Sequence, residues 1–166
     1  MSVAICPGSF DPITLGHLNI IRRTAKIFDH VIVCIMFNSE KTQPMFTIEE
    51  RADMVRRAVK RYRNVEVDTF EGLLAEAVRK YPGAVLVKGL RATSDFEYEF
   101  QMNLINKKIN PRLETMFLTS DEKYTFLSSS VVREMARYDG DLVGLVPNEL
   151  IDEVKEKAKL GRRKNG

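Results

Sequence analysis

His17 ends a loop rich in glycine and proline, and its side chain could act on a phosphate. The loop reads Pro-Gly-Ser-Phe-Asp-Pro-Ile-Thr-Leu-Gly over residues 7–16, and a helical stripe of apolar residues follows it. A helix beginning near His17 would present unpaired N–H groups and a partial positive charge, which favour phosphate. Gly16 would let the backbone approach that ligand. The alternative is a plain turn in which His17 only caps the helix. The loop is neither a P-loop nor a GxGxxG loop.

Cationic side chains follow two other apolar runs. Lys41 lies in the polar segment after residues 31–37, and Lys88 and Arg91 flank a glycine at the end of the run 84–88. Lysine offers a phosphate a point charge, and arginine offers a planar fork of donors. Taken one at a time, each of these residues could equally be a surface charge on a turn.

Hydroxyl and acidic side chains begin two further helical patterns. Ser128 to Ser130 precede a pattern that continues to Tyr138. Serine is a common N-cap residue, and its hydroxyl and the free N–H groups of a helix start can also bind phosphate. In the segment 95–99, helix capping explains most of the acids, whereas Glu99 could face a ribose or a ring.

Short apolar runs alternate with helical stripes along the chain. Strands are predicted at 3–6, 31–37, 65–68, 84–88 and 115–119, and helices at 17–28, 47–62, 73–80, 95–109, 129–138 and 147–160. This alternation predicts an α/β fold, a doubly wound five-stranded parallel sheet with helices on both faces. Ligands bind beyond the carboxyl ends of such strands, so we expect the loops after strands one, two, four and five to form one polyphosphate site.

Length and composition fit a single domain. The chain has 166 residues, a net charge of +3, 44% hydrophobic and 30% charged residues, as in soluble globular proteins. We expect one domain over 1–160 and a basic, flexible tail over 161–166. The chain lacks an apolar stretch long enough to span a membrane and a signal peptide, so a cytoplasmic protein is expected. Cys6 and Cys34 lie in apolar runs, which favours buried thiols over a disulfide or a zinc site.

Several of these motifs resemble those of a known superfamily. Thr14-Leu15-Gly16-His17 resembles the (H/T)xGH motif of the nucleotidyltransferases, and the serines at 128–130 resemble their second signature. The chain is similar to the bacterial phosphopantetheine adenylyltransferases from about Val3 to Pro147. The matching segments are 7–14, 44–46, 49–51, 89–91, 95–99 and 126–130.

This resemblance implies a Rossmann-like nucleotidyltransferase fold and transfer of AMP from ATP to 4'-phosphopantetheine, giving dephospho-coenzyme A and pyrophosphate in the penultimate step of coenzyme A biosynthesis. It also implies a homo-hexamer, feedback binding of coenzyme A, and Mg²⁺ that is carried by ATP with no protein side chain assigned to it. Because a phosphate monoester is already anionic, direct in-line attack without a covalent intermediate is expected.

The resemblance also implies roles for individual residues. The catalytic residues would be His17, Lys41, Arg91 and Ser129. The ATP-binding residues would be Ser9, Phe10, His17, Gly89, Leu90, Arg91, Glu99, Tyr124, Thr125, Phe126, Leu127, Ser128, Ser129 and Ser130. The residues that bind 4'-phosphopantetheine would be Ser9, Lys41, Leu74 and Lys88. Position 88 is often arginine in the family, and lysine replaces that fork with a point charge.

Three other functions are consistent with parts of the sequence. Another small-molecule nucleotidyltransferase is the nearest, either of the nicotinamide mononucleotide type or of the glycerol-3-phosphate cytidylyltransferase type. Residues 126–130 do not match the signature of the latter. A non-catalytic nucleotide-binding protein is disfavoured by the presence of His17, Lys41 and Arg91. A nucleic-acid binder would have to use the basic tail, and the chain carries no recognisable module for it. Neither nucleic acid nor membrane is therefore expected as a partner.

Overall fold

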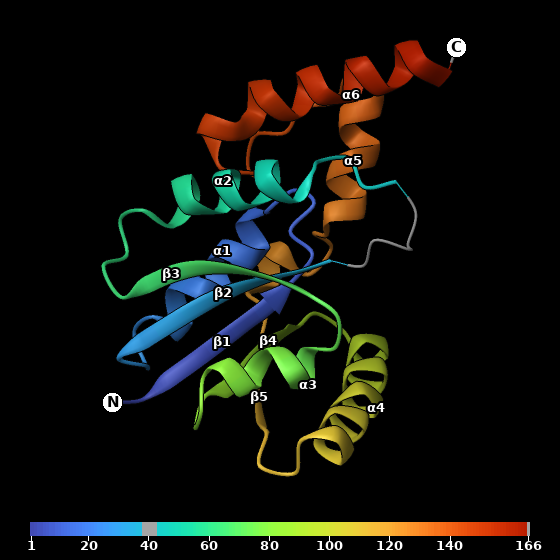
Figure 1. The fold of residues 1–166 in the computed structure, drawn as a ribbon. Coiled ribbons are helices and arrows are strands. Elements are labelled where there is room, and N and C mark those ends of the chain that lie inside the picture. The colour runs from blue at the N-terminus through green and yellow to red at the C-terminus, as the bar shows by residue number, and fades with distance from the viewer. Residues whose placement is uncertain (38–42, 166) are drawn as a thin grey trace.

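The computed structural model describes residues 1–37 and 43–165, with the backbone alone described at 93, 94 and 162–165 (Figure 1). Five strands form one parallel sheet in the order β3-β2-β1-β4-β5. They are β1 Val3–Gly8, β2 His30–Phe37, β3 Val65–Glu71, β4 Val85–Leu90 and β5 Glu114–Thr119. The strand order reverses between β1 and β4, and this is the position at which doubly wound sheets bind ligands. The predicted fold is confirmed.

Helices cover both faces of this sheet. They are α1 Leu15–Thr24, α2 Ile48–Val59, α3 Leu74–Ala77, α4 Thr93–Ile109, α5 Ser129–Arg137 and α6 Ile151–Asn165. Short 3-10 turns lie at η1 Val78–Lys80, η2 Glu122–Tyr124 and η3 Asn148–Leu150. In Figure 1, α1, α2, α5 and α6 lie on one side of the sheet, and α3 and α4 lie on the other.

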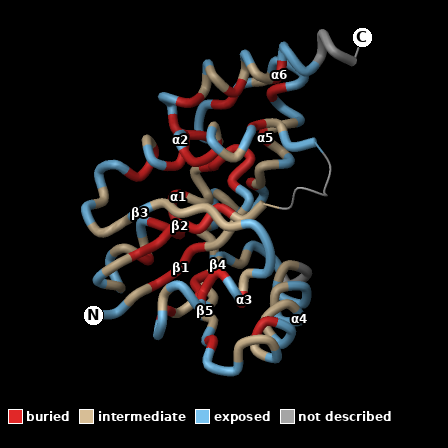
Figure 2. Tube along the Cα trace, viewed as in Figure 1, coloured by how far each residue is buried: buried red, intermediate tan, exposed pale blue. Residues whose placement is uncertain are grey.

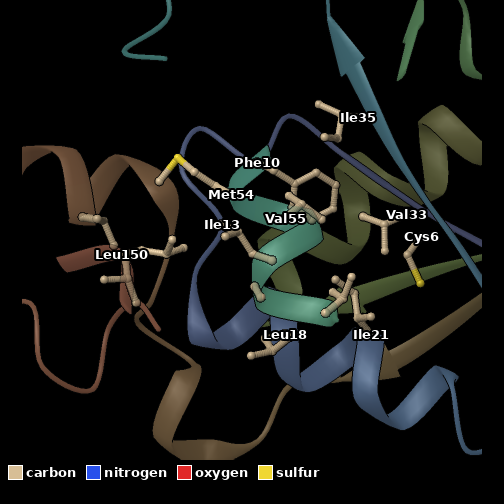
Figure 3. Close-up of a cluster of buried hydrophobic side chains, with 14 of the residues drawn as sticks. Cys6, Phe10, Ile13, Leu18, Ile21, Val33, Ile35, Met54, Val55 and Leu150 are labelled. Atoms are coloured by element: carbon tan, nitrogen blue, oxygen red, sulfur yellow. The ribbon is translucent and has the colours of Figure 1, made fainter. Parts of the chain in front are cut away.

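The strands are buried on both faces, which explains their near-continuous apolar sequences. Along β1, Cys6 packs with the helices on the α1–α2 side, whereas Ile5 packs with the α3 side. Figure 2 shows the buried residues concentrated in the central strands and in the helices above them. In Figure 3, Cys6 shares its cluster with Phe10 and Val55.

Both cysteines are buried and free, as predicted. Burial raises the pKa of the Cys6 thiol to about 12. Burial, together with the nearby Asp68 carboxylate, raises the pKa of Cys34 to about 11. Both groups are therefore uncharged thiols near neutral pH, which is the state of a buried structural cysteine rather than of a nucleophile.

Several predicted boundaries were wrong. Helix α1 begins at Leu15 rather than His17 because Thr14 is its N-cap, and it ends at Thr24, after which residues 25–28 form a turn. The short apolar run after Glu71 forms only one α-helical turn and one 3-10 turn. Helix α6 continues past Leu160 to Asn165. A glycine such as Gly161 weakens a helix by about 1 kcal/mol without ending it.

Ion pairs join α2 to α6. Lys157 contacts both carboxylate oxygens of Glu50, at 2.6 and 2.8 Å, and Arg57 contacts Glu153 at 2.6 Å. Glu50 also accepts the backbone N–H of Thr47, while the Thr47 hydroxyl accepts that of Glu50, which forms a capping box. The start of α2 is therefore fixed both by its own cap and by the last helix.

Candidate functional site

A cavity of about 590 Å³ opens at the carboxyl ends of β1 and β4, where the strand order reverses. Its walls come from the β1–α1 loop, the first turns of α1, the exit of β4, one face of α4 and the segment 120–129. Cavities of this size suit a nucleotide-sized ligand. The sheet topology therefore brings together loops that are far apart in the sequence.

The imidazole of His17 forms part of this wall and also caps its own helix. Its Nδ1 accepts the backbone N–H of Thr14 at 3.0 Å, while the Thr14 hydroxyl oxygen accepts the backbone N–H of His17 at 3.2 Å. The ring meets Phe10 edge-on, with centroids 5.0 Å apart. Because Nδ1 is the acceptor, the proton of the neutral ring resides on Nε2. His17 can thus donate one hydrogen bond to a ligand.

His17 is neutral at physiological pH. Burial of the ring, with a smaller contribution from the positive charge of Arg91, lowers the pKa of His17 to about 4. A neutral imidazole next to a phosphate offers a hydrogen-bond donor without a second positive charge. The capping interpretation and the ligand interpretation of His17 are therefore compatible, because each uses a different ring nitrogen.

Two helix N-termini face the cavity. Thr14 caps α1, and Ser128 caps α5 by accepting the backbone N–H of Val131 at 3.2 Å. Ser129 donates its hydroxyl to the carbonyl oxygen of Pro12 at 2.8 Å. The hydroxyl predicted to hold phosphate therefore ties α5 to the β1–α1 loop. The first N–H groups of both helices remain suited to an anion.

The two cations at the exit of β4 are each paired with an acid of α4. Lys88 Nζ lies 2.6 Å from Glu99 Oε2, and Arg91 Nε lies 3.1 Å from Asp95 Oδ2. Arg91 also donates Nη1 to the carbonyl oxygen of Leu127 at 2.9 Å. Asp95 and Glu99 are one helical turn apart, so both project from one face of α4. A phosphate that binds Lys88 or Arg91 has to share it with, or take it from, a carboxylate.

Gly89 lies between these cations, and a side chain there would not fit. A Cβ atom added at Gly89 would lie 2.9 Å from Cγ1 of Ile20. Glycine therefore lets α1 pack directly against the exit of β4. This close packing brings the His17 helix and the cations of β4 to the same cavity.

Most of the predicted site residues that the structure describes line this one cavity. They are Ser9, Phe10, His17, Leu74, Lys88, Gly89, Arg91, Glu99, Tyr124, Leu127, Ser128 and Ser129. Leu90, Thr125, Phe126 and Ser130 do not line it. The roles predicted for all of these residues stay predictions. Lys41 lies outside the described residues.

Other lining residues were not predicted. Asp95, Tyr98 and Met102 come from α4, and Ser120 follows β5. The spacing of Asp95 and Glu99, and that of Tyr98 and Met102, is one helical turn, which could have indicated a common face. No comparable local signal marks Ser120.

The β1–α1 loop is held from behind by side chains that do not line the cavity. The Asp11 carboxylate accepts the backbone N–H groups of Met45 and Phe46, at 3.0 and 2.9 Å. Arg133 donates to the carbonyl oxygen of Asp11 at 2.7 Å, and Arg51 donates to that of Ser9 at 3.0 Å. This framework fixes the backbone that presents Ser9 and Phe10.

Within residues 1–37 and 43–165, no group of three or more His, Cys, Asp or Glu side chains could hold a metal ion. In the same part of the chain, no helix is both long enough and apolar enough to cross a membrane.

Comparison with known proteins gives consistent results. Residues 5–135 match the cytidylyltransferase-like family. The chain is 52% identical over 160 residues to a phosphopantetheine adenylyltransferase of Dictyoglomus turgidum, covering 96% of this chain and 99% of that protein. It is 50% identical over 159 residues to that of Caldanaerobacter subterraneus, with 96% and 99% covered.

A solved structure extends the likeness to three dimensions. A candidate nicotinate-nucleotide adenylyltransferase from Vibrio parahaemolyticus superposes with a TM-score of 0.67 and 19% identity, covering 95% of this chain and 96% of that one. At this identity the likeness shows the fold alone.

Proposed function

This chain belongs to the cytidylyltransferase-like family and, within it, to the phosphopantetheine adenylyltransferases, and on that premise we propose that it transfers AMP from ATP to 4'-phosphopantetheine. The products are dephospho-coenzyme A and pyrophosphate. One observation of the structure carries most weight. A single cavity gathers two helix N-termini, a neutral histidine donor and two cations at the switch point of the sheet. These groups suit a triphosphate beside a second phosphate.

The proposed reaction is a direct displacement at the α-phosphorus of ATP. An oxygen of the acceptor phosphate forms a bond to this phosphorus while the bond to the bridging oxygen breaks, and pyrophosphate leaves with that electron pair. The acceptor oxygen is already negatively charged near pH 7, so a general base is not needed. Catalysis then depends on positioning and on stabilising charge at the phosphoryl oxygens.

His17 has a defined part in this scheme. Its Nδ1 is fixed by the backbone N–H of Thr14, so Nε2–H is the donor that the ring can direct to an α-phosphoryl oxygen. Burial and the charge of Arg91 lower the pKa of His17 to about 4, so the ring is neutral at pH 7 before the substrates bind. We assign it as a hydrogen-bond donor to developing charge and not as an acid or base.

Lys88 and Arg91 would contact phosphate through the N–H donors that are not used in their ion pairs with Glu99 and Asp95. Lysine has three N–H donors and arginine has five, so one ion pair does not saturate either residue. Lys88 would serve the acceptor phosphate, with Leu74 beside the pantetheine arm, and Arg91 the nucleotide. Glu99, which contacts Lys88 at 2.6 Å, would lie between the two ligands.

Mg²⁺ is proposed to arrive with ATP. The two acidic side chains in the lining, Asp95 and Glu99, are both paired with cations, so the described side chains offer no separate site for the metal. Mg²⁺ prefers phosphate oxygens and water over an all-protein cage. Its contribution would be to neutralise phosphate charge.

Assembly into a homo-hexamer is proposed from an apolar strip on α4 and β5. Phe96, Phe100, Leu104, Ile105 and Met116 are all between 40% and 54% exposed in the single chain. Exposed apolar residues clustered on neighbouring elements favour burial against further copies. Sedimentation should show a mass near six chains. Leu104→Lys should lower that mass, and a wild-type monomer would contradict the proposal.

Coenzyme A feedback and a cytoplasmic location complete the proposal. Coenzyme A carries the pantetheine arm of the acceptor, so it would fit the same cavity and compete with 4'-phosphopantetheine. Inhibition that acceptor does not relieve would contradict competition at this site. Fractionation of the source cells would test the location.

The decisive experiment varies the acceptor. The protein is incubated with Mg²⁺ and either ATP plus 4'-phosphopantetheine, ATP plus nicotinamide mononucleotide, or CTP plus glycerol-3-phosphate. Pyrophosphate release is expected with the first pair alone. Release with another pair would assign a different nucleotidyltransferase activity, and release with none would leave a non-catalytic nucleotide-binding protein.

Stereochemistry at phosphorus tests the mechanism separately. With ATP made chiral at the α-phosphorus, one in-line displacement inverts the configuration. Retention would require two displacements and hence a covalent enzyme intermediate, which would overturn the direct attack.

A further inference from the structure

Arg51 on α2 is a buried cation that has no carboxylate partner among residues 1–37 and 43–161, whose side chains the structure describes apart from 93 and 94. Arg51 as a whole is 6% exposed to solvent. Its Nε donates to the carbonyl oxygen of Thr47 at 3.4 Å, and its Nη1 donates to that of Ser9 at 3.0 Å. Across the described chain, no carboxylate oxygen lies within 4.0 Å of its guanidinium. Both of its acceptors are therefore neutral.

The nearby carboxylate is engaged elsewhere. Asp11 is 7% exposed and accepts two backbone N–H groups, those of Met45 and Phe46. Its nearest ion-pair contact is Arg133, whose Nη1 lies 3.9 Å from Asp11 Oδ2. Among the described side chains that hold the β1–α1 loop from behind, Arg51 and Arg133 thus carry two positive charges against the single carboxylate of Asp11.

A buried charge without a partner is expensive unless something compensates it. Arg51 is bonded to the carbonyl oxygen of a cavity-lining residue, Ser9, so its charge lies directly behind the cavity wall. In a poorly hydrated environment a charge acts over a longer range than in water, because screening is weaker. Arg51 therefore raises the electrostatic potential at the place where an anion would bind.

We propose that Arg51 is a positioning residue for the phosphate site, which holds the Ser9 loop and supplies from behind the wall a positive charge that a bound polyphosphate compensates. The ligand class is a multiply charged phosphate chain. The inference rests on the proposed function in one respect, namely that the phosphates of ATP lie beside Ser9.

Two substitutions separate the charge from the shape. Arg51→Met removes the charge and keeps much of the volume, whereas Arg51→Lys keeps the charge and one donor. Isothermal titration with inorganic tripolyphosphate is expected to show binding weakened at least about tenfold in Arg51→Met and within about threefold of wild type in Arg51→Lys. The affinity of Arg51→Met should also fall less steeply with added salt, because one charge no longer contributes.

Arg56→Met is the matched control. Arg56 is an exposed arginine of the same helix, so its substitution makes the same change in net charge at a site screened by solvent. It is expected to leave tripolyphosphate affinity within about twofold of wild type. If Arg51→Met does not fold, Arg51→Gln, which is neutral and keeps an amide donor, takes its place with the same expectation.

Two outcomes would overturn the inference. One is wild-type affinity in the neutral variant. The other is equal weakening in the neutral variant and in Arg51→Lys, which would show that the shape of the side chain matters and its charge does not. Tripolyphosphate titration needs neither acceptor nor turnover. Failure of the acceptor assay would therefore leave this result standing, and failure here would leave the adenylyltransferase proposal standing.

Discussion

Helices α2 and α4 cover opposite faces of the same sheet, yet they are packed very differently. Helix α2 buries Met54 and Val55 completely and is joined to α6 by ion pairs. Helix α4 leaves Phe100 and Leu104 about half exposed, and Asn106 is its one buried residue among those whose side chains are described. Figure 2 shows α4 mostly exposed or half-buried, in contrast to α2.

The residues of the site are correspondingly held in two different ways on the two sides of the sheet. On the α2 side, the loop carrying Ser9 is held by buried groups such as Arg51 and Asp11. On the α4 side, Lys88 and Arg91 are held by ion pairs with Glu99 and Asp95, which are partly open to solvent. We infer that the α2 side fixes the geometry of phosphate binding, whereas the α4 side adjusts charge.

The largest expected difference between the two sides is in stability. Met54→Ala should lower the free energy of unfolding by about 2–5 kcal/mol, since it leaves a cavity in a close-packed cluster. Leu104→Ala should change it by about 0.5 kcal/mol or less, because that side chain is 54% exposed in the single chain. Urea unfolding at concentrations where the protein is monomeric measures both. Similar losses in the two variants would remove the contrast.

The next effect is on turnover. His17→Ala should reduce kcat about 10²-fold or more, which is the scale of losing one donor to developing charge. The substitution also removes the acceptor for the Thr14 N–H, so a melting temperature should be recorded alongside the rate. An unchanged kcat in a folded variant would remove His17 from the mechanism.

Lys88, on the α4 side, should instead affect the binding of 4'-phosphopantetheine. Lys88→Met should raise the KM for 4'-phosphopantetheine about tenfold or more, with a smaller change in kcat, because a charged hydrogen bond to the acceptor phosphate is lost. Lys88→Arg keeps the charge and should stay within about threefold of the wild-type KM. If Lys88→Met lowers kcat and leaves KM unchanged, the division of roles between the two sides is wrong.

At neutral pH the smallest expected effect is that of pH itself, because the ionisation of His17 contributes only in acid. The pKa of His17 is about 4 in the folded protein, against about 6.5 in an unfolded chain. Above pH 6.5 neither state binds the proton, so its contribution to stability is constant. As the pH falls from 6.5 toward 4, the unfolded state takes up the proton first, and the free energy of unfolding falls by up to about 1.4 kcal/mol per pH unit.

Nuclear magnetic resonance can follow this ionisation directly. The chain has two histidines, so a His30→Gln variant leaves the ring signal of His17 alone. A titration midpoint well below pH 6 is expected. A midpoint near 6.5 would show that the ring is not shielded in the way that its burial indicates. Activity should likewise show no inflection from His17 between pH 6 and 8.

The sheet could be predicted because strands such as β2, buried on both faces, are almost wholly apolar. Because ligands bind beyond the carboxyl ends of parallel strands, the region of the site could be predicted as well. The structure places His17, Lys88 and Arg91 on one cavity there. The start of α1 was misplaced because Leu15 and Gly16 read as part of a loop. Only the backbone geometry shows that Thr14 caps the helix there.

Hydrogen bonds between residues far apart in the sequence could not be predicted from local sequence patterns. The bond from Ser129 to Pro12 joins residues 117 positions apart, and nothing near either residue indicates it. The burial of Arg51 is not indicated by any local pattern, because arginine is rarely buried. Its actual burial depends on the fold of the β1–α1 loop, which packs over it.

The pairing of β1 with both β2 and β4 has a consequence for how the chain is made. Ala4 lies beside Val31 on one side and beside Val85 on the other. During synthesis β1 can join β2 early, but its second neighbour emerges from the ribosome much later, and α5 follows still later. At about 5–20 residues per second, this interval lasts seconds. Strand β1 lies at the centre of the finished sheet, but during synthesis it is at first an edge strand. Its free edge can pair with other chains until β4 covers it.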